Sequence, residues 1–412
     1  MNWPIVAFEE LYAAPSRNGV TRPSRVRGDG FKMINMGELF AHDRIGDIEM
    51  ERVKLSATEL TTMLVEAGDL LFARQSLVLA GAGKCSIVTD VAEPTTFESH
   101  LIRVRLNREV ADPLFFHYYF KSPSSGMKAI VTQGVQAGIR GSDLMRLPVS
   151  VPPLEVQKRI ATSIAAYDDL IENNRKRIAL LGEAARMLYR EWFVHFRFPG
   201  HEHGAFVDGL PANWSRLPIR ELADLYRGKS YSSAELIEVK GQPFVNLKCI
   251  DRNGGFRTSG LKRFRGEFKP QHRVDPGDIV IAVTDMTRDA LVVARAARIP
   301  RSVGSEAIFS MDLVKLMPQP AVNRAWFYGL LRYSSFPMEV REKATGATVL
   351  HLLPRHIEAW AAPVPPPVLR NMYGDHHEAL LAQIDSLELQ NEKLAEARDL
   401  LLPRLMNGNL TV

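Results

Sequence analysis

Polar side chains that could hydrogen-bond to the edges of nucleic-acid bases follow two similar apolar runs. Arg74, Gln75 and Ser76 come directly after GDLLFA, while Thr284 and Arg288 come shortly after GDIVIA. Arg can donate two parallel hydrogen bonds to guanine, Gln can pair with adenine, and a hydroxyl can serve either base. Side chains placed just past a strand end lie in loops, where binding residues gather. The two clusters are therefore candidates for base contacts.

Two later loops offer side chains of the same kind. They are punctuated by glycine at 134–141 and at Gly346, and each precedes a proline-rich segment. For every polar loop residue the alternative is plain solvation. The candidates in these loops are Gln133, Gln136 and Arg140 in the first and Thr345, Thr348 and His351 in the second.

Basic residues gather in two loop-like segments and predict contacts with phosphate. Residues 1–150 carry 17 Lys and Arg against 17 Asp and Glu, whereas residues 214–365 carry 23 against 15, so the second region should attract phosphate more strongly. A solvated charged face is the alternative for each segment. The stronger segment contains Lys248, Arg252, Arg257, Lys262, Arg263, Arg265, Lys269 and Arg273, and the weaker one contains Arg17, Arg22, Arg25, Arg27 and Lys32.

The elements that must position these residues are written twice in the chain. VEAGD at 65–69 matches VDPGD at 274–278, and Phe115 matches Trp326, at an offset that stays near 210. In the first copy, strand-like runs lie at 69–74, 84–90 and 101–107 and are followed by the helical segment PLFFHYYF. The aromatic residues of that segment are expected in the domain core rather than on a base-stacking surface.

A long helix follows each copy. After Pro152 and Pro153, and again after Pro365–Pro367, core-capable residues recur in steps of four and three, the spacing of a coiled-coil seam. A one-sided stripe predicts a single partner helix. The first seam is Ile160, Ile164, Tyr167, Ile171, Asn174, Ile178, Leu181, Ala185, Leu188 and Trp192, and the second is Leu380, Ile384, Leu387, Asn391, Leu394, Arg398, Leu401 and Leu405.

Each seam carries one asparagine, Asn174 and Asn391. If the helices pair antiparallel, the two amides share a layer and fix the register, because a buried amide is tolerated when another polar group meets it. We therefore predict an α/β (α+β) fold in which two similar domains are separated by two long antiparallel coiled-coil helices with an approximate two-fold repeat. The predicted boundaries are 1–152 and 213–366 for the domains, 153–196 and 367–406 for the helices, 197–212 for a linker, and 407–412 for a tail.

Composition and motifs exclude several classes of function. The apolar and charged fractions are those of an ordinary globular protein, and no apolar run approaches the length of a membrane span, so we expect a cytoplasmic protein with no membrane contact. Cys85 and Cys249 match no metal spacing and are expected to be reduced. GAGK at 81–84 lacks the first glycine and the final hydroxyl of a phosphate loop. The linker histidines lack a fourth metal ligand, and we predict no metal site and no catalytic residue.

The chain resembles the specificity subunit of type I restriction-modification systems over nearly its whole length. The resemblance rests on REWFVHFRFPGHE at 190–202, LPANWSRLPI at 210–219, LLPRLMNGNL at 401–410, and the GDLLFAR and GDIVIAV motifs. It implies two target recognition domains that each read half of a split double-stranded DNA site, and two antiparallel helices that dock modification subunits.

The resemblance also implies partners and cofactors. Two methyltransferase subunits and the restriction or translocase subunits are expected as partners, with S-adenosylmethionine, ATP and Mg²⁺ used by those chains and none bound by this one. Docking is expected on the outer helix faces, at Arg175, Arg186 and Trp192, whose alternative is an ordinary solvated flank. Two other interpretations stay open: an autonomous DNA-modifying enzyme, which the missing catalytic motif disfavours, and a coiled-coil spacer whose domains bind protein.

Overall fold

The computed structural model describes residues 3–134, 136–285, 291–346 and 349–410. Contacts divide the chain into two compact units: unit 1 is Met1–Ile171 with Lys393–Val412, and unit 2 is Glu172–Glu392. Two predicted contact residues, Arg288 and Thr348, lie outside the described residues. Both units mix helices and strands, which fits the α+β prediction.

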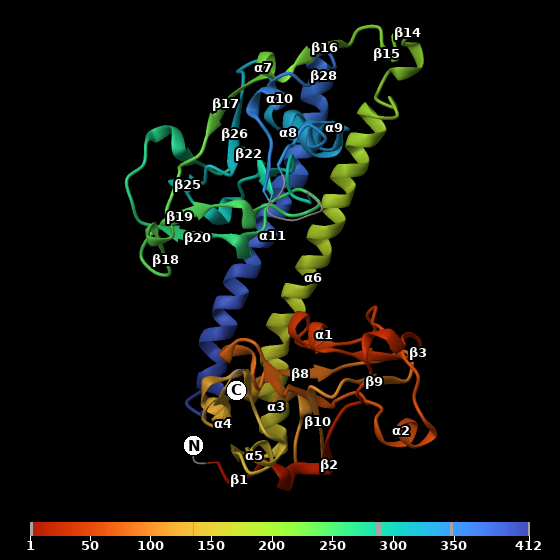
Figure 1. Cartoon of the computed structure of the whole chain (residues 1–412), viewed down its shortest axis with the longest axis vertical. Helices are drawn as coiled ribbons and strands as arrows, with labels where there is room; N and C mark the ends of the chain where they lie inside the picture. The colour runs from red at the N-terminus through yellow and green to blue at the C-terminus, as the bar shows by residue number, and fades with distance from the viewer. Residues whose placement is uncertain (1–2, 135, 286–290, 347–348, 411–412) are drawn as a thin grey trace. The chain divides into compact units, whose positions relative to one another are not determined.

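The central sheet of unit 1 has the strand order β2-β10-β6-β8-β4, and the apolar run after Gly68 forms its middle strand (Figure 1). All four residues of that strand are buried, because neighbouring elements cover it on both faces. The strands are β2 (Tyr12–Asn18), β4 (Arg44–Ile45), β6 (Leu70–Ala73), β8 (Cys85–Val88) and β10 (Leu101–Leu106).

Smaller sheets surround the central sheet of unit 1. Their orders are β5-β3-β9, β11-β12-β7 and β1-β13. Their strands are β1 (Ile5–Ala7), β3 (Arg27–Ile34), β5 (Arg52–Val53), β7 (Gln75–Ser76), β9 (Thr95–Phe97), β11 (Thr132–Gln133), β12 (Ala137–Gly138) and β13 (Pro148–Ser150). The short helices are α1 (Met36–Ala41), α2 (Ala57–Thr62), α4 (Met127–Ile130) and α5 (Gly141–Met145).

The aromatic helix α3 (Pro113–Lys121) lies in the core of unit 1, as predicted. It begins sharply because Pro113 stands in its first turn and the Asp112 carboxylate accepts a hydrogen bond from the backbone N–H of Phe115 at 2.7 Å. The rings of Phe116 and Phe120 pack against Phe8. The aromatic residues of α3 therefore build the core and offer no stacking surface.

The main sheet of unit 2 repeats this plan. Its order, β17-β26-β22-β24, matches β2-β10-β6-β8 strand for strand. The strands are β17 (Ala223–Arg227), β22 (Ile279–Ala282), β24 (Ala296–Arg298) and β26 (Leu313–Pro318). The aromatic helix α8 (Arg324–Tyr333) takes the place of α3, with Trp326 fully buried. The repeat seen in the sequence is thus also a repeat of strand order within each unit.

Further small elements complete unit 2. A five-stranded sheet has the order β18-β20-β19-β25-β21, and pairs are formed by β14 with β15, β16 with β28, and β23 with β27. The strands are β14 (Phe206–Val207), β15 (Leu210–Pro211), β16 (Ser215–Pro218), β18 (Leu236–Ile237), β19 (Gln242–Val245), β20 (Lys262–Phe264), β21 (Arg273–Val274), β23 (Thr284–Asp285), β25 (Ala307–Phe309), β27 (Leu350–His351) and β28 (Ala361–Val364). The helices are α7 (Ile219–Leu222), α9 (Phe336–Arg341) and α10 (Pro354–Glu358).

The repeated GD motif explains how each main strand begins. Gly68 and Gly277 have φ of +94° and +92°, a backbone conformation that favours glycine. The following aspartate closes the turn, since the Asp69 carboxylate accepts a hydrogen bond from the backbone N–H of Glu66 and Asp278 does the same for Asp275. The motif therefore turns the chain directly into β6 and β22.

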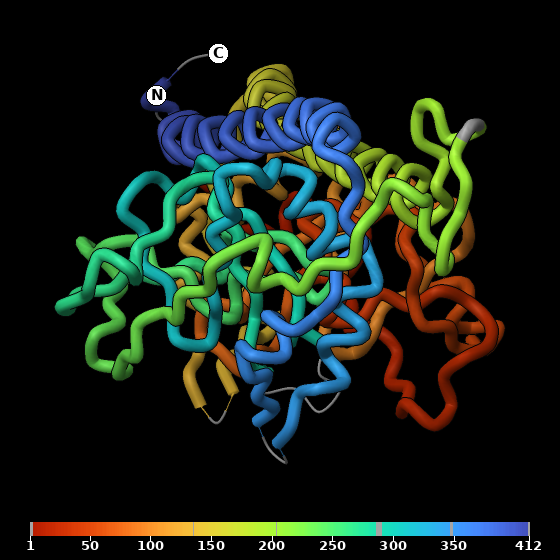
Figure 2. Tube along the Cα trace, turned by 90° about the horizontal axis from the view of Figure 1, so that it is seen from above, coloured from red at the N-terminus to blue at the C-terminus, as the bar shows by residue number. Residues whose placement is uncertain are grey.

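The two long helices are α6 (Leu154–Phe193) and α11 (Pro367–Met406), and each contributes one part to each unit. All predicted seam residues are buried or half-buried. In unit 2, α11 also runs along the domain (Figure 2), and its Tyr373 joins the domain core. In unit 1, Ile160 and Leu405 join the domain core. The one-sided stripe predicted a single partner for each helix. In each unit, however, the helices pack on the domain as well as on one another.

The chain ends and the linker complete the description. Trp3 and Gly408 lie side by side in unit 1, near the two marked ends of the chain (Figure 1). The linker predicted at 197–212 contains the small hairpin β14–β15. Both cysteines are free and buried. Among the described residues, no helix is long and apolar enough to cross a membrane.

Candidate nucleic-acid interface

A small strand ladder in unit 1 brings the two predicted reading loops together. Strand β7, which holds Gln75, pairs with β12, and β12 pairs with β11, which holds Gln133. The backbone N–H of Ile139 also donates to the carbonyl of Arg74 at 2.9 Å. The segments at 74–76 and 132–140 are distant in sequence, yet hydrogen bonds fix them beside one another.

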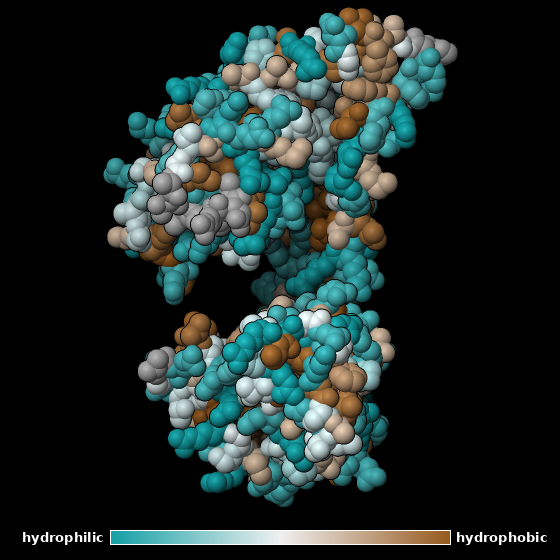
Figure 3. All heavy atoms as spheres, turned by 45° about the vertical axis from the view of Figure 1, so that its right-hand side comes forward, coloured by the Kyte–Doolittle hydropathy of each residue, from teal (hydrophilic) through white to brown (hydrophobic). Residues whose placement is uncertain are grey.

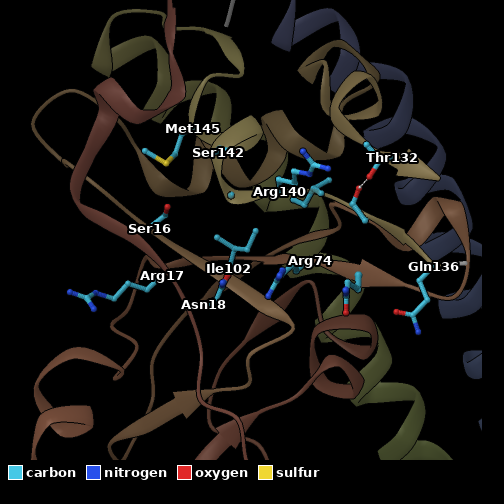
Figure 4. Close-up of a pocket in the computed structure, with 14 residues that line it drawn as sticks. Ser16, Arg17, Asn18, Arg74, Ile102, Thr132, Gln136, Arg140, Ser142 and Met145 are labelled. Carbon is cyan, nitrogen blue, oxygen red and sulfur yellow. Dashed lines mark hydrogen bonds between the residues drawn. The ribbon is translucent and has the colours of Figure 1, made fainter. Parts of the chain in front are cut away.

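The ladder borders a hollow of about 420 Å³ (Figure 4). Four predicted contact residues line it: Arg74, Gln75, Gln136 and Arg140. Arg140 is exposed and the Arg74 side chain is half-buried. Neither guanidinium has a carboxylate partner among the described residues, so both charges remain available to an anion or to a base edge.

Other residues also line this hollow, and of these only Arg17 was named from the sequence. Arg17 and Asn18 reach it from β2, which pairs with β10 in the register that sets Asn18 opposite Ile102. Thr132 and Ser142 also line it. Arg17 carried a signal, since it belongs to the basic segment of the first copy. Asn18 carried none, because only the strand register shows which residues border the hollow.

The prediction for Ser76 needs a correction. Its side chain is buried, and its hydroxyl oxygen accepts a hydrogen bond from the backbone N–H of Val78 at 3.2 Å. Thr284 in unit 2 is also buried, and its hydroxyl donates to the Asp312 carboxylate at 3.0 Å. Each hydroxyl has an internal structural partner and little surface, so both residues position the loops rather than present a group to a ligand.

Unit 2 contains an equivalent ladder. Thr284 of β23 pairs with His351 of β27, and the backbones of Thr345 and His351 exchange two hydrogen bonds, at 2.8 and 3.0 Å. Thr345 and His351 are exposed. The predicted loops of the second copy therefore also meet, although Arg288 and Thr348 lie outside the described residues.

The basic segment of unit 2 is exposed. Its predicted members Lys248, Arg252, Arg257, Lys262 and Arg263 all lie on the surface of the domain. In the part of the chain that the structure describes, none of them forms an ion pair, and Arg257 and Arg263 use their side chains only to reach backbone carbonyls. Hydrophilic side chains cover most of the visible face of the domain (Figure 3). Unneutralised cations in this setting suit the phosphate backbone of a nucleic acid.

The basic segment of unit 1 is largely neutralised by carboxylates of its own unit. Arg22 forms two hydrogen bonds with Glu59 at 2.7 and 2.8 Å, and Arg27 contacts Glu51 at 2.5 Å. The predicted contact residue Arg27 is therefore engaged within the protein. Arg25 is exposed and has no ion pair among the described residues.

Lys32 shows the same neutralisation most fully. Its ammonium lies 2.7 Å from the Asp47 carboxylate and 3.4 Å from the Glu93 carboxylate. The hydrogen bond to Asp47 raises the pKa of Lys32, because the positive form is the one that the carboxylate stabilises. The lysine thus serves the fold of unit 1.

A cleft of about 1100 Å³ lies in unit 2 between domain loops and the two helices. The predicted residues Arg186 and Arg257 line it. Six arginines and four acidic residues line the cleft, and Glu183 pairs with Arg186 at 2.5 Å. The charged lining residues of the cleft are Glu183, Arg186, Arg190, Asp251, Arg257, Arg295, Arg298, Arg332, Asp385 and Glu388.

The two asparagines of the helix seams meet in unit 2. The Asn174 amide nitrogen donates to the Asn391 amide oxygen at 3.0 Å. This is the contact predicted from the heptad positions, and it satisfies a side chain that is only 6% exposed. In unit 1 the polar contact between the two helices is ionic, since Arg398 contacts Asp168 at 2.5 Å.

Of the three predicted docking residues, Trp192 needs a correction. Its side chain is buried and its ring lies 6.0 Å from that of Tyr373. The seam spacing that placed Trp192 inward was the better guide, because the last turns of α6 meet both α11 and the domain core. Arg175 is exposed, and Arg186 is half-buried beside Glu183, so these two remain surface residues of α6.

Comparisons with known proteins connect this geometry to a family. Residues 30–182 match the model of the type I restriction modification DNA specificity domain. Among curated relatives, the MjaIX specificity subunit of a type I restriction enzyme from Methanocaldococcus jannaschii is 23% identical over 360 residues, which cover 83% of this chain and 79% of that protein. The MjaVIII specificity subunit of the same organism is 22% identical over 329 residues, which cover 76% of this chain and 74% of that protein.

Two further comparisons are also with specificity subunits of type I systems. The EcoKI specificity subunit from Escherichia coli is 25% identical over 237 residues, which cover 55% of this chain and 46% of that one. The crystal structure of a type I restriction-modification S subunit from M. genitalium superposes with a TM-score of 0.59 at 15% identity, over 98% of this chain and 96% of that one. This last similarity is one of fold.

Proposed function

From the similarity to the type I restriction modification DNA specificity domain and to specificity subunits, we propose that the chain is the non-catalytic subunit that selects DNA sequence for a type I restriction-modification complex. Each unit would read one half of a split double-stranded site. The observation that carries the proposal is the pair of equivalent ladders, β7–β12 and β23–β27, which gather polar loop residues at the same place in both domains.

In unit 1 we propose that Arg74, Gln75, Gln136 and Arg140 contact base edges from around the hollow. The support is chemical: two guanidiniums and two amides without carboxylate partners offer the paired donors and acceptors that discriminate bases in a major groove. Gln133 and Arg25, both exposed, would contact the flanking backbone.

In unit 2 we propose that different residues contact bases and phosphates. Thr345 and His351 at the ladder would contact bases, while Lys248, Arg252, Arg257, Lys262 and Arg263 would contact phosphates. The ladder residues are few and polar, whereas the basic segment is exposed and unneutralised. Phosphate contacts carry most of the salt dependence of DNA binding, so unit 2 would supply the larger electrostatic part of the affinity.

We propose that α6 and α11 set the number of unread base pairs between the half-sites. Each helix has 40 residues, or ~60 Å at 1.5 Å per residue. At about 34–36 Å per turn of B-DNA, this corresponds to roughly one to one and a half turns of spacer. The matched strand orders support an approximate two-fold repeat, and the Asn174–Asn391 contact would keep the helix register.

We further propose that two methyltransferase subunits dock on exposed helix faces that include Arg175 and Arg186, and that restriction subunits join them. S-adenosylmethionine, ATP and Mg²⁺ would be used by those partner chains. The relatives are named as subunits of restriction enzymes, which supports an assembly role. Among the described residues no cluster of acidic, histidine or cysteine side chains could hold a metal ion.

The testing experiment is selection of bound sites from random duplex DNA, with the chain co-expressed with its neighbouring methyltransferase subunit. A split consensus with two fixed halves around an unread spacer is expected. One added helical turn in both helices should lengthen the spacer and leave both halves unchanged. A contiguous consensus would overturn the two-reader model, and the absence of any consensus would favour domains that bind protein.

A further inference from the structure

An aliphatic tip projects from unit 1 beside the candidate reading residues. It consists of Leu77, Val78 and Leu79, which are 85%, 64% and 54% exposed. In the described part of the chain this is the longest run of consecutive exposed large hydrophobic residues. Isolated exposed aliphatics are common, but three in a row form a local apolar surface that water solvates poorly. We call Leu77–Leu79 the apolar tip.

The backbone of the apolar tip is held in place. The backbone N–H of Val78 donates to the buried Ser76 hydroxyl, and the N–H of Gly81 donates to the carbonyl of Val78 at 3.0 Å. Gly81 packs so closely that an added Cβ would lie 2.3 Å from the Ser76 hydroxyl oxygen and 3.0 Å from the Phe40 ring. The turn therefore presents its aliphatic side chains outward. The buried Ser76 hydroxyl supports this turn by accepting the hydrogen bond from Val78.

The apolar tip borders the residues proposed to read bases. A hollow of about 410 Å³ is lined by Leu77 and Val78 together with Gln75 and Gln136. The same two glutamines also line the polar hollow that holds Arg74. Amide and aliphatic groups thus stand side by side on one continuous surface, with guanidiniums next to them.

This combination matches the major-groove edge of an A·T pair. Adenine offers an acceptor and a donor that suit a glutamine amide, and the paired thymine offers a carbonyl and a 5-methyl group beside them. The 5-methyl group is the apolar feature of the major-groove edges. An aliphatic side chain placed next to a base-reading amide would therefore meet it.

We propose that the apolar tip reads thymine 5-methyl groups in the half-site bound by unit 1. The proposal rests on the proposed function and adds the chemical identity of part of the target. Duplex DNA is the favoured occupant over a protein partner because the tip is small and is continuous with a surface that carries Arg74, Arg140 and two glutamines. A protein partner is left as an outcome of the test.

The test uses the chain assembled with its methyltransferase subunit and duplexes that carry the selected consensus. The unit 1 half-site is identified as the half whose preference changes in Gln136→Ala. Each thymine of that half is then replaced singly by deoxyuridine, which removes only the methyl group. At one position or more, wild-type affinity should fall about fourfold, since burying one such group contributes about 0.8 kcal/mol and 1.4 kcal/mol is tenfold.

Substitution in the tip provides the second arm of a double-mutant cycle. Leu77→Ser and Val78→Thr should lose a similar factor on thymine DNA and little more on deoxyuridine DNA, because the partner methyl is already gone. Ile5→Thr, at an aliphatic residue of unit 1 that is 69% exposed and lies on β1, serves as the matched control and should bind as wild type.

Several results would overturn the proposal while leaving the proposed function intact. They are a unit 1 half-site without thymine on either strand, wild-type affinity unchanged at every deoxyuridine, or equal losses for Leu77→Ser on both DNAs. Weaker capture of the methyltransferase by Leu77→Ser, with normal DNA affinity once assembled, would assign the tip to a protein partner. Failure of the wild-type complex to prefer any sequence would instead remove the proposed function.

Discussion

The two units carry similar basic segments in different surroundings. In unit 1, Arg22, Arg27 and Lys32 each lie within 2.7 Å of a carboxylate. In unit 2, Arg273 lies 3.6 Å from Glu306, while the other seven cations between 248 and 273 form no ion pair among the described residues. The number of cations in a sequence segment therefore does not measure its attraction for phosphate. What matters is whether the fold supplies acids to them.

A carboxylate on the long helices differs between the two units in the same sense as the cations do. Burial disfavours ionisation of Asp168 in unit 1, but hydrogen bonds from Tyr118 at 2.7 Å and Arg398 at 2.5 Å outweigh it and hold the pKa below its usual value. In unit 2, burial together with the nearby Asp385 raises the pKa of Glu388 to about 7. Unit 1 thus supplies partners for Asp168 and for three cations of its basic segment. Unit 2 leaves most cations of its basic segment unpaired, and it leaves Glu388 partly buried without full compensation.

The largest expected effect comes from removing free cations in unit 2. The triple variant Lys248→Ala, Arg252→Ala, Lys262→Ala should bind DNA about 100-fold more weakly near 0.1 M salt, and the slope of log affinity against log salt should become shallower by about 3. Fluorescence anisotropy across a salt series measures both quantities.

The matched triple in unit 1 is Arg22→Ala, Arg27→Ala, Lys32→Ala. Its salt slope should change by less than about 1, because these cations already face carboxylates. Circular dichroism would verify that both triples stay folded. If both folded triple variants changed the slope of log affinity against log salt equally, the two basic segments would not differ in their contacts with phosphate.

Single substitutions at the two ladders should separate the half-sites. Arg140→Ala in unit 1 is expected to relax base preference about tenfold at one position of one half-site, because a bidentate contact contributes roughly 1–3 kcal/mol of discrimination. His351→Ala should act only on the other half. Repeating the site selection with each variant measures this. Loss of preference in both halves from one substitution would mean that the units do not read independently.

The polar seam contact of unit 2 is open to a double-mutant cycle. Asn391→Leu should lower the free energy of unfolding by about 2 kcal/mol, since it leaves the buried Asn174 amide without its partner. Adding Asn174→Leu should recover most of the loss. Urea unfolding with tryptophan fluorescence reports the change. Additive losses in the double variant would show that the two amides do not stabilise one another.

The smallest expected effect concerns pH. Between about pH 4.5 and 7, folded Glu388 keeps its proton while the unfolded chain has released it, so the free energy of unfolding should fall as pH rises through this window. Glu388→Gln should remove that fall and stabilise the protein at pH 8 by about 1–2 kcal/mol. Asp168→Asn is the contrasting variant, because a lowered carboxyl pKa stabilises at neutral pH and the contribution is lost as pH falls. Thermal unfolding across pH compares them.

Much of the fold could be predicted because its signals are local. The GD turns, the apolar strand runs and the aromatic helices depend on residues within ten positions of one another, and the helix seams depend on spacing alone. The contact of Asn174 with Asn391 followed from the same spacing. These patterns specify an element and its buried face before any tertiary contact is known.

The remaining features depend on partners far away in sequence. Nothing near Arg27 indicates that Glu51 will neutralise it, and nothing near Ser76 indicates that its hydroxyl will support a turn. Trp192 fell in a seam position and was also predicted on the outer helix face, and its burial against Tyr373 rules out the second placement. Such outcomes require the register of strands and helices, which one sequence does not provide.

The composition of unit 1 from both ends of the chain has a consequence for biosynthesis. Leu402, Leu405 and Met406 belong to the same core as Phe8 and Phe116, whereas unit 2 is a single continuous stretch, Glu172–Glu392. On the ribosome, the chain therefore finishes unit 2 before it releases the last helix turns that complete unit 1. The domain synthesised first therefore completes its core last, and a chain without residues 393–412 would lack part of the core of unit 1 while keeping every residue of unit 2.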